Sequence, residues 1–215
     1  MKKFLRRNGL SVVVIALFLV TYLGGQILTG WHVHNDEREE HHEAPLGLGD
    51  YLTSAHFWEA TAENWESEFL QMFVYVYITA FLFQKGSAES NDPDKPEEKR
   101  NVSPASPWPV RKGGLWLKVY AHSLSLAFAV LFLISFWVHA CSSVRLENEE
   151  RARLGLGAIS LSEHLGGSRF WFESFQNWQS EFLAIGSMIL LSIFLREKGS
   201  PESKPVEAPH GETGG

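Results

Sequence analysis

Hydrophobic residues are gathered into four blocks along the chain, separated by polar and charged segments. The first block, 10–31, has no Asp, Glu, Lys or Arg in 22 positions, and the third, 124–144, has none in 21. The second and fourth, 69–83 and 182–195, hold only 15 and 14 uncharged residues. Roughly 20 apolar residues are needed to cross a bilayer core. The long blocks therefore predict membrane-spanning helices, while each short block alone fits either a buried helix or a short span.

An internal repeat resolves this ambiguity. Residues 57–90 recur 113 positions later as 170–203, and 15 of the 34 positions are identical. The shared residues include an Asn-Trp-x-Ser-Glu-Phe-Leu motif, which begins at Asn64 and Asn177, and a later Lys-Gly-Ser-x-Glu-Ser motif. Each short block follows its long block at the same place in its copy, so each copy supplies two helices. We therefore predict an all-α membrane protein with four transmembrane helices, arranged as two tandem two-helix repeats of the same orientation.

This prediction divides the chain into four segments. They are residues 1–90 as the first two-helix repeat, 91–114 as a disordered cytoplasmic linker, 115–203 as the second two-helix repeat and 204–215 as a disordered tail. The linker carries five prolines among Ser, Asp, Glu and Lys, and has too little apolar surface to fold alone. Ser54 and Ser168 are placed to cap the two returning helices, and Gly86 and Gly199 to end them in a left-handed conformation.

The distribution of charge predicts the orientation. The net charge is -6, yet the two termini and the linker together hold 14 Lys and Arg residues. The two segments between the long and the short block of each copy, 32–68 and 145–181, hold five, and we call them the outer connections. The positive-inside rule places both termini and the linker in the cytoplasm, so we expect a multi-pass protein of the bacterial cytoplasmic (inner) membrane. The basic N-terminus followed by block 10–31 also resembles a signal peptide. That block aligns with the internal block 124–144, so we expect it to be retained.

The repeated Asn-Trp-x-Ser-Glu-Phe-Leu motif supplies a candidate site. If the second helix of each copy spans about 20 residues, Glu68 and Glu181 lie about one turn below the outer boundary. An ionisable group at that depth is costly unless it faces protein or water, and it marks a candidate functional site. Asn64 and Asn177 lie four residues earlier on the same helical faces, where they could cross-link the two copies. The alternative is that the glutamates are buried structural groups or charges at helix N-termini.

Histidines raise two further hypotheses. His32, His34, His41 and His42 are interleaved with acidic residues and offer ligands for a divalent metal, but their spacing matches no closed motif and a solvated acidic loop is the simpler interpretation. His122 and His139 lie at opposite ends of the third block, and haem ligation there lacks partner histidines on the other blocks. We therefore expect no cofactor, and no catalytic motif appears.

The motifs also carry a resemblance. The residues that carry it include 4–11, the Gly25-Gln26-x-Leu28-Thr29-Gly30 stretch, and the two motifs that begin at Asn64 and Lys85. With these residues the chain resembles an uncharacterised family of small bacterial membrane proteins, classed as a domain of unknown function, over nearly all of 4–203. The resemblance implies a membrane protein and supplies neither an activity nor site residues.

Two functions follow as hypotheses. The first is a non-enzymatic membrane protein that contacts the lipid bilayer and binds an unknown protein partner or a second copy of itself, with no nucleic acid because topology explains its basic residues. The second is a small transporter or channel that uses Glu68 and Glu181 at its outer mouth. The polar face below Glu68 continues with Gln71 and Tyr75, but Ala184 and Met188 replace these in the second copy, which disfavours a conduit within one chain.

Overall fold

A computed structural model describes residues 2–95 and 101–214, and all regular secondary structure in these ranges is helical. The contacts divide the chain into two compact units, which we call the first unit (1–62 with 138–164) and the second unit (63–137 with 165–215). The predicted linker is only partly described, because residues 96–100 lie outside the described residues.

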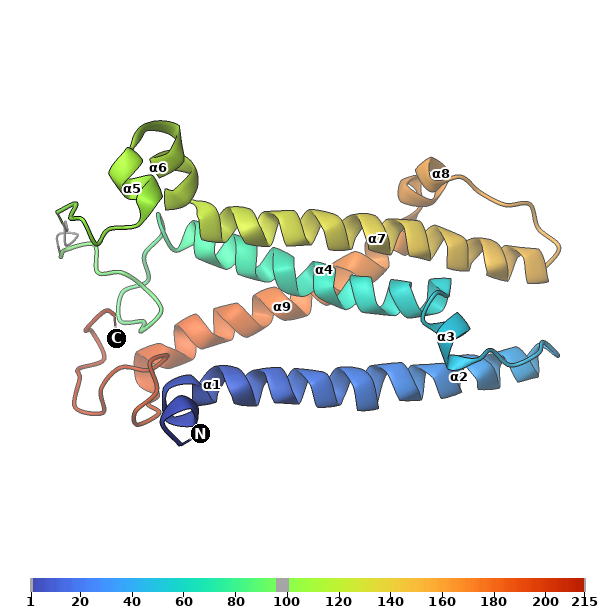
Figure 1. Ribbon diagram of the computed structural model, residues 1–215, viewed down its shortest axis with the longest axis horizontal. Coiled ribbons are helices and arrows are strands. Elements are labelled where there is room, and N and C mark those ends of the chain that lie inside the picture. The colour runs from blue at the N-terminus through green and yellow to red at the C-terminus, as the bar shows by residue number, and fades with distance from the viewer. Residues whose placement is uncertain (1, 96–100, 215) are drawn as a thin grey trace. The chain divides into compact units, whose positions relative to one another are not determined.

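The first long block lies within a continuous run of helix from residue 4 to residue 40. It comprises helix α1 (Lys2–Leu19), a π-helical segment η1 (Val20–Ile27) and helix α2 (Leu28–Glu40), as Figure 1 shows. Asn8 leaves helical geometry, with φ -126° and ψ 15°, and kinks α1 near its start. In η1 the wider turn accompanies the pair Gly24 and Gly25, which lack a Cβ and tolerate unusual backbone geometry.

Most of the second block, 69–78, lies in a helix that begins before the block, and the last five residues of the block lie beyond the end of that helix. After the short helix α3 (Leu48–Tyr51), helix α4 runs over Ala55–Ile78, which is 24 residues. The Ser54 hydroxyl oxygen accepts a hydrogen bond from the Phe57 backbone amide at 3.2 Å, so the predicted N-cap at Ser54 is confirmed. Helix α4 therefore begins at Ala55, well before the apolar block, and includes Trp58 and the repeated motif that starts at Asn64.

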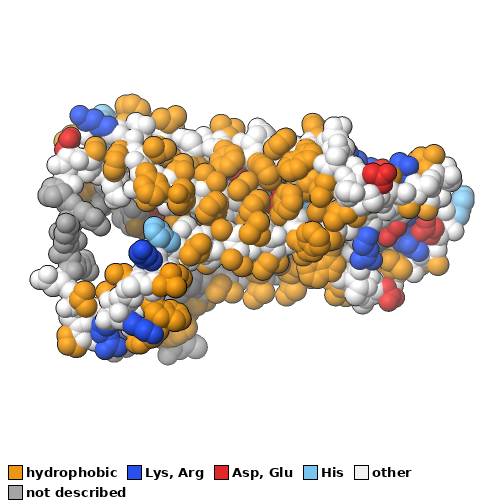
Figure 2. Space-filling model, turned by 90° about the horizontal axis from the view of Figure 1, so that it is seen from above, with side chains coloured by type: hydrophobic (Ala, Val, Ile, Leu, Met, Phe, Trp, Pro, Cys, Tyr) orange, Lys and Arg blue, Asp and Glu red, His pale blue; other side chains and the backbone are white. Residues whose placement is uncertain are grey.

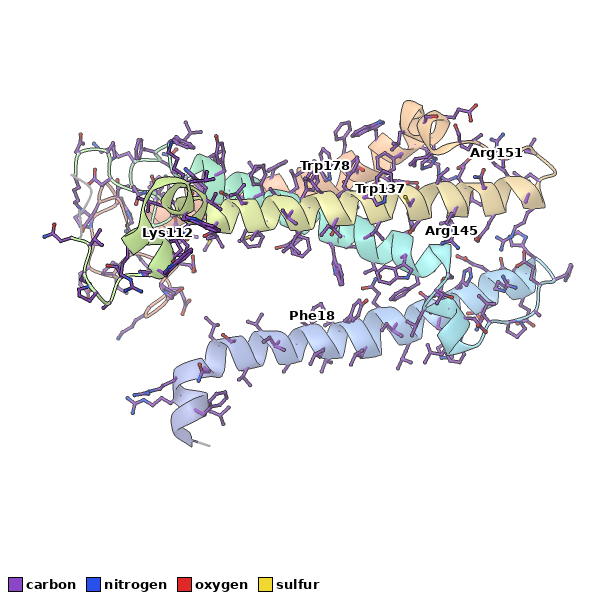
Figure 3. All side chains as sticks on the ribbon, turned by 45° about the horizontal axis from the view of Figure 1, so that its top comes forward. Phe18, Lys112, Trp137, Arg145, Arg151 and Trp178 are labelled. Atoms are coloured by element: carbon purple, nitrogen blue, oxygen red, sulfur yellow. The ribbon has the colours of Figure 1, made fainter. Side chains whose placement is uncertain are left out.

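Two short helices lie where the predicted linker, 91–114, meets the second repeat, and the first of them falls inside the linker. Helix α5 (Trp108–Lys112) follows Pro107, and helix α6 (Gly114–Ala121) follows it directly. The Lys112 ammonium lies 4.9 Å from the ring centres of both Trp108 and Trp116 (Figure 3). These cation–π contacts give the end of the linker a local structure that proline content alone does not indicate.

Helix α7 (Ser123–Arg153, 31 residues) contains the third block and continues into a charged C-terminal half, where Arg145 and Arg151 lie beyond Trp137 (Figure 3). Helix α8 (Leu161–Gly166) and helix α9 (Ser168–Phe194, 27 residues) follow. The predicted cap at Ser168 is wrong, because Gly167 occupies the N-cap position and no side chain caps α9. Gly167 aligns with Ser54, so the second copy has lost the hydroxyl that caps the first.

Among the described residues, two helices are long and apolar enough to cross a membrane: Phe4–Glu40 and Ser123–Arg153. The sequence predicts four such helices. Helices α4 and α9 do not meet this criterion because charged and other polar residues occupy their N-terminal halves, which shortens the apolar run in each. Length and composition therefore support two crossings, and the prediction of four depends on further argument.

The helical surface is mostly apolar, as the face drawn in Figure 2 shows. Large hydrophobic side chains are exposed on α1, α7 and α9, among them Leu10 (79 %), Leu133 (61 %) and Leu183 (67 %). Fully buried side chains include polar ones, such as Thr61, Glu66 and His139 at 0 %. This distribution is the reverse of that in a water-soluble protein, in which large contiguous apolar patches are rare.

The C-terminal tail has defined contacts in the structure, although the sequence predicts disorder for 204–215. Lys204 is 1 % exposed, and its ammonium donates hydrogen bonds to the carbonyl oxygens of Gly86, Pro209, His210 and Glu212. An ammonium with several carbonyl acceptors satisfies groups that burial would otherwise leave unpaired. One lysine thus connects the tail to the loop that contains Gly86, and the disorder of 204–215 stays a prediction.

Candidate functional site

Three hydrogen bonds join helices α4 and α9 inside the second unit, and we call this set the polar layer. The bonds run from Asn177 Nδ2 to Glu63 Oε1 at 2.6 Å, from Trp178 Nε1 to Glu66 Oε1 at 2.9 Å, and from Gln71 Nε2 to the backbone oxygen of Glu181 at 2.9 Å. Each bond connects a residue of one sequence copy to a residue of the other. Inside an apolar environment such bonds hold helices together because the alternative is an unsatisfied polar group.

The four sequence-predicted site residues have different positions relative to this layer. Asn177 belongs to it through its side chain, and Glu181 belongs to it through its backbone oxygen. Asn64 and Glu68 lie on exposed positions of α4, and the polar layer uses neither side chain. The copies are therefore linked by polar contacts, but the partners on α4 are Glu63, Glu66 and Gln71.

Sequence reasoning missed Glu66, which is 0 % exposed and accepts the indole hydrogen of Trp178. Glu66 occupies the variable position of the repeated motif, where the second copy has Gln179, so a comparison of the two copies discards it. Helical spacing is the signal that could have found it. Glu63, Glu66 and Gln71 hold positions i, i+3 and i+8 of α4, and such positions lie on one face of a helix.

The two outer connections are closed by the same contacts in both copies. The side chain of Asn35 bonds the backbone of Leu46 in both directions, at 2.8 and 3.1 Å, and Arg38 Nε donates to the Ala44 oxygen at 2.8 Å. The corresponding contacts 113 positions later join Asn148 to Ile159 at 2.8 and 3.0 Å, and Arg151 Nε to the Gly157 oxygen at 2.7 Å. In each copy these hydrogen bonds close the loop that follows the long helix, because they join residues of the helix to the backbone 6 and 11 residues later.

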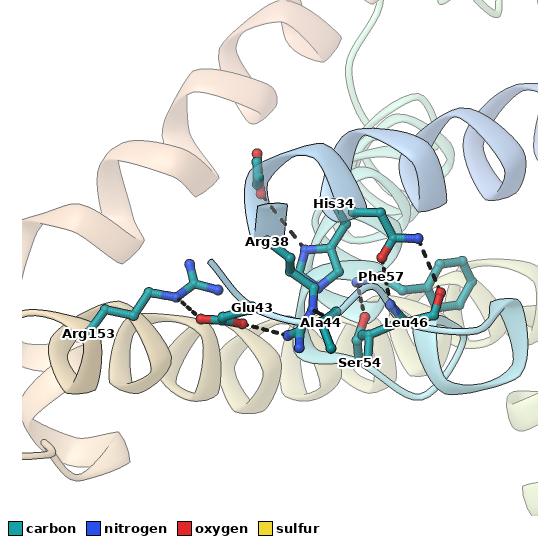
Figure 4. Close-up of polar contacts among 10 residues, drawn as sticks. His34, Arg38, Glu43, Ala44, Leu46, Ser54, Phe57 and Arg153 are labelled. Atoms are coloured by element: carbon teal, nitrogen blue, oxygen red, sulfur yellow. Dashed lines mark hydrogen bonds and ion pairs between the residues drawn. The ribbon is translucent and has the colours of Figure 1, made fainter. Parts of the chain in front are cut away.

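Glu43 lies between two arginines in the first unit (Figure 4). Its carboxylate accepts from Arg38 Nη1 and from Arg153 Nε, each at 2.8 Å. The hydrogen bond from Arg153 is the main reason that the pKa of Glu43 is lowered, and the charge of Arg38 adds to it. Glu43 therefore stays ionised and ties the first outer connection to the end of α7.

The histidines of the first connection separate into two kinds. His32, His41 and His42 are exposed, whereas His34 is 4 % exposed and lies beside His56 of α4, with ring centres 4.6 Å apart. The Tyr51 ring lies 5.8 Å from the His34 ring and 5.9 Å from the His56 ring. Sequence reasoning did not include His56 because it lies 22 positions after His34, on a different helix.

The Lys-Gly-Ser-x-Glu-Ser motif forms the same small loop in each copy. The Gln84 amide donates to the Ser90 hydroxyl at 2.9 Å, and the Glu197 amide donates to the Ser203 hydroxyl at 2.9 Å. Gly86 and Gly199 have φ of 87° and 86°. The predicted left-handed conformation is confirmed, but its place is wrong: these glycines lie inside the motif loop, several residues beyond the ends of α4 and α9.

Glu89 and Glu202, one from each of these loops, interact in the second unit. The Tyr75 hydroxyl donates to a carboxylate oxygen of Glu89. Burial raises the pKa of Glu89, the neighbouring Glu202 raises it further, and the hydrogen bond from Tyr75 acts against them. Glu89 and Glu202 hold the same position in the two copies of the motif.

Comparison with known proteins gives one family. The model of a family described as a domain of unknown function, DUF6766, matches residues 1–215. Among curated proteins and among solved structures, nothing matches the chain at a significant level.

Proposed function

We propose a non-enzymatic membrane role for this chain, which belongs to the DUF6766 family, a domain of unknown function. It is a four-helix integral protein of the bacterial cytoplasmic membrane, built from two tandem repeats of the same orientation, with both termini in the cytoplasm. It acts by binding a partner, either another membrane protein or a second copy of itself.

The observation that carries this proposal is the apolar helical surface combined with polar contacts between helices. Leucines on α1, α7 and α9 are more than half exposed, while Glu66 is fully buried and bonded. In water this arrangement would expose apolar surface and bury charge at a high cost. In a bilayer the same arrangement is stable, because lipid covers the apolar side chains and the buried polar groups bond one another.

Helix length supports the two additional crossings. Helix α4 has 24 residues and α9 has 27, and at 1.5 Å per residue even α4 reaches about 36 Å, more than the roughly 30 Å of a hydrocarbon core. The acidic residues that exclude them from a simple hydropathy criterion are partly those of the polar layer, where Glu63 and Glu66 receive hydrogen bonds from α9. A charge bonded between helices does not prevent a span.

The polar layer favours the structural role over a conduit. Asn177 bonds Glu63 and Gln71 bonds the backbone of Glu181, so these groups serve helix contact. The transporter alternative needs Glu68 and Glu181 to exchange a proton or cation. It remains the second candidate because Glu68 and Glu181 hold the same position in the two copies of the repeated motif, and both lie in the second unit.

Reconstituted protein separates the two functions. Proton and cation flux into proteoliposomes is measured for the wild type, for the double variant Glu68→Gln with Glu181→Gln, and for empty liposomes. The partner-binding proposal predicts that all three give the same flux. A wild-type flux well above that of empty liposomes and abolished in the double variant would establish the transporter instead.

Membrane integration is checked on the same preparations. Alkaline carbonate removes peripheral proteins from membranes but leaves proteins with spanning helices in the pellet. We expect the wild type in the pellet, and release into the supernatant would contradict the proposal.

A further inference from the structure

His34 and His56 form a stacked pair inside the first unit that is not explained by packing alone. Their rings are 4.6 Å apart at the centres and inclined by 28°, and Tyr51, which is 1 % exposed, covers both. The pair joins helix α2 to the first turn of α4. Neutral imidazole is the commonest metal ligand in proteins, so two histidines side by side in a protected position are a candidate for binding one ion.

Both rings have a nitrogen without a hydrogen bond. His34 Nδ1 and His56 Nδ1 are buried, and within 2–95 and 101–214 neither has a hydrogen-bond partner. A buried polar atom without a partner costs free energy and calls for an explanation.

A carboxylate completes the cluster. Glu37 Oε2 lies 3.8 Å from His34 Nδ1, and one ligand atom from each of His34, Glu37 and His56 lies within 4.8 Å of the others. In a tetrahedral zinc site with bonds of 2.0–2.1 Å, the donor atoms are about 3.4 Å apart. The side chain of Glu37 is 50 % exposed, so it has room to rotate and bring its oxygen closer to the histidine nitrogens.

We propose that His34, His56 and Glu37 bind one divalent transition metal ion of the zinc type. Two imidazole nitrogens and one carboxylate oxygen are a ligand set that such ions accept, with water at the remaining position. Binding gives both Nδ1 atoms a partner and ties α2 to α4. A cavity of about 300 Å³, lined in part by His34, Ser54 and Glu149, adjoins the site, and it gives an ion and its water a route in.

The charges around the site are compatible with a cation. Arg38 and Arg153 are the nearest basic groups of the cavity wall, and both are engaged by Glu43 at 2.8 Å (Figure 4). Glu149 adds a negative charge to the same wall.

The second copy lacks this ligand set. The positions that correspond to His34, Glu37 and His56 are Glu147, Glu150 and Arg169. Arg169 Nε instead pairs with Glu173 at 3.1 Å. The proposal therefore predicts one ion per chain and not two.

Zinc titration into purified full-length protein in detergent tests the site. The protein for this experiment is prepared without a polyhistidine tag, which would itself bind metal. Binding is followed by isothermal titration calorimetry and by the visible absorption of Co²⁺ used in place of Zn²⁺. The wild type is expected to bind one ion. His34→Gln, His56→Gln and Glu37→Gln are each expected to weaken binding roughly tenfold or more and to change the Co²⁺ spectrum.

A matched control distinguishes this site from the acidic loop. The double variant His41→Gln with His42→Gln removes two exposed histidines of the same connection and is expected to bind as the wild type does. Zinc should raise the thermal unfolding temperature of the wild type and of this control, and not that of His56→Gln. Circular dichroism verifies the fold of each variant, and the half-buried His56 carries the test if His34→Gln fails to fold.

Three results would overturn the proposal. They are absence of binding by the wild type at micromolar zinc, loss of binding in the control variant, and unchanged binding in a correctly folded His56→Gln variant. The second result would assign the metal to the solvated loop. None of the three bears on the membrane topology, so the two proposals fail separately.

Discussion

Single residues show how the two copies have diverged while keeping the same contact. Gly30 packs against Tyr51 so closely that a Cβ at Gly30 would meet the Tyr51 hydroxyl oxygen at 2.3 Å. The residues 113 positions later are Ser143 and His164, and there the Ser143 hydroxyl and His164 Nε2 form a hydrogen bond at 2.9 Å. A large ring against glycine in one copy is thus replaced by a smaller ring against serine in the other.

This exchange predicts a compensating pair of substitutions. Gly30→Ser should destabilise the protein by about 1–3 kcal/mol, because it overpacks the site against a buried ring. Adding Tyr51→His should recover a large part of that loss by recreating the serine–histidine pair. Thermal unfolding in detergent measures both variants. A double variant no more stable than Gly30→Ser alone would show that the two contacts are not equivalent.

The left-handed glycines of the two motif loops, Gly86 and Gly199, offer a matched comparison. A Cβ at Gly86 would lie 2.6 Å from the His210 backbone oxygen, whereas a Cβ at Gly199 would meet nothing within 4 Å. Gly199→Ala should therefore cost only the left-handed backbone strain, about 1–2 kcal/mol. Gly86→Ala should cost more and should also release the C-terminal tail. Limited proteolysis of the tail checks this, and equal cleavage of the two variants would contradict it.

A third residue-scale prediction concerns pH. The pKa of Glu89 is raised in the folded state, so the folded protein holds this proton more tightly than the unfolded chain. The stabilisation is complete below the unfolded pKa, near 4.3, and is lost as the pH rises through the folded pKa. Glu89→Gln should therefore flatten the fall in stability above that range. Unfolding followed from pH 4 to 8 tests it, and an unaltered pH profile would exclude Glu89 as the cause.

At the scale of helices, the sequence predicted what depends on local pattern and missed what depends on contact. The apolar blocks fall on the helices observed, except that α4 ends at Ile78, five residues before the end of the second block, and Ser54 caps α4 as predicted. The sequence did not predict that α4 presents Glu63 and Glu66 to α9, because the choice of buried face depends on the partner helix. The hydrogen bond from Lys204 to the Gly86 carbonyl oxygen is likewise a contact between residues that are distant in the sequence.

A comparison of Glu66 with Glu68 tests whether contact with α9 decides which glutamate of α4 matters for stability. Glu66 is fully buried and bonds Trp178, while Glu68 is exposed on the same helix. Glu66→Leu leaves the Trp178 indole without its acceptor and should cost about 1–3 kcal/mol, whereas Glu68→Leu should cost little if lipid faces that position. Thermal unfolding in detergent ranks the two. A larger loss of stability in Glu68→Leu than in Glu66→Leu would contradict this and would show that the glutamate of the repeated motif is the more important one.

At the scale of the whole molecule, the proposal depends on the number of crossings. With four spanning helices, the linker between the copies is in the cytoplasm, on the same side as both termini. With only Phe4–Glu40 and Ser123–Arg153 as spans, the chain would leave the cytoplasm once and return once, and the linker would lie outside. The position of the linker therefore distinguishes the two arrangements.

Cysteine labelling on intact cells reads this position directly. Cys141 is the one cysteine of the chain, and in a Cys141→Ser background single cysteines are introduced as Asn91→Cys in the linker and His42→Cys in the first outer connection. A membrane-impermeant thiol reagent should label His42→Cys in intact cells and should label Asn91→Cys only after permeabilisation. Labelling of Asn91→Cys in intact cells would contradict the four-helix account.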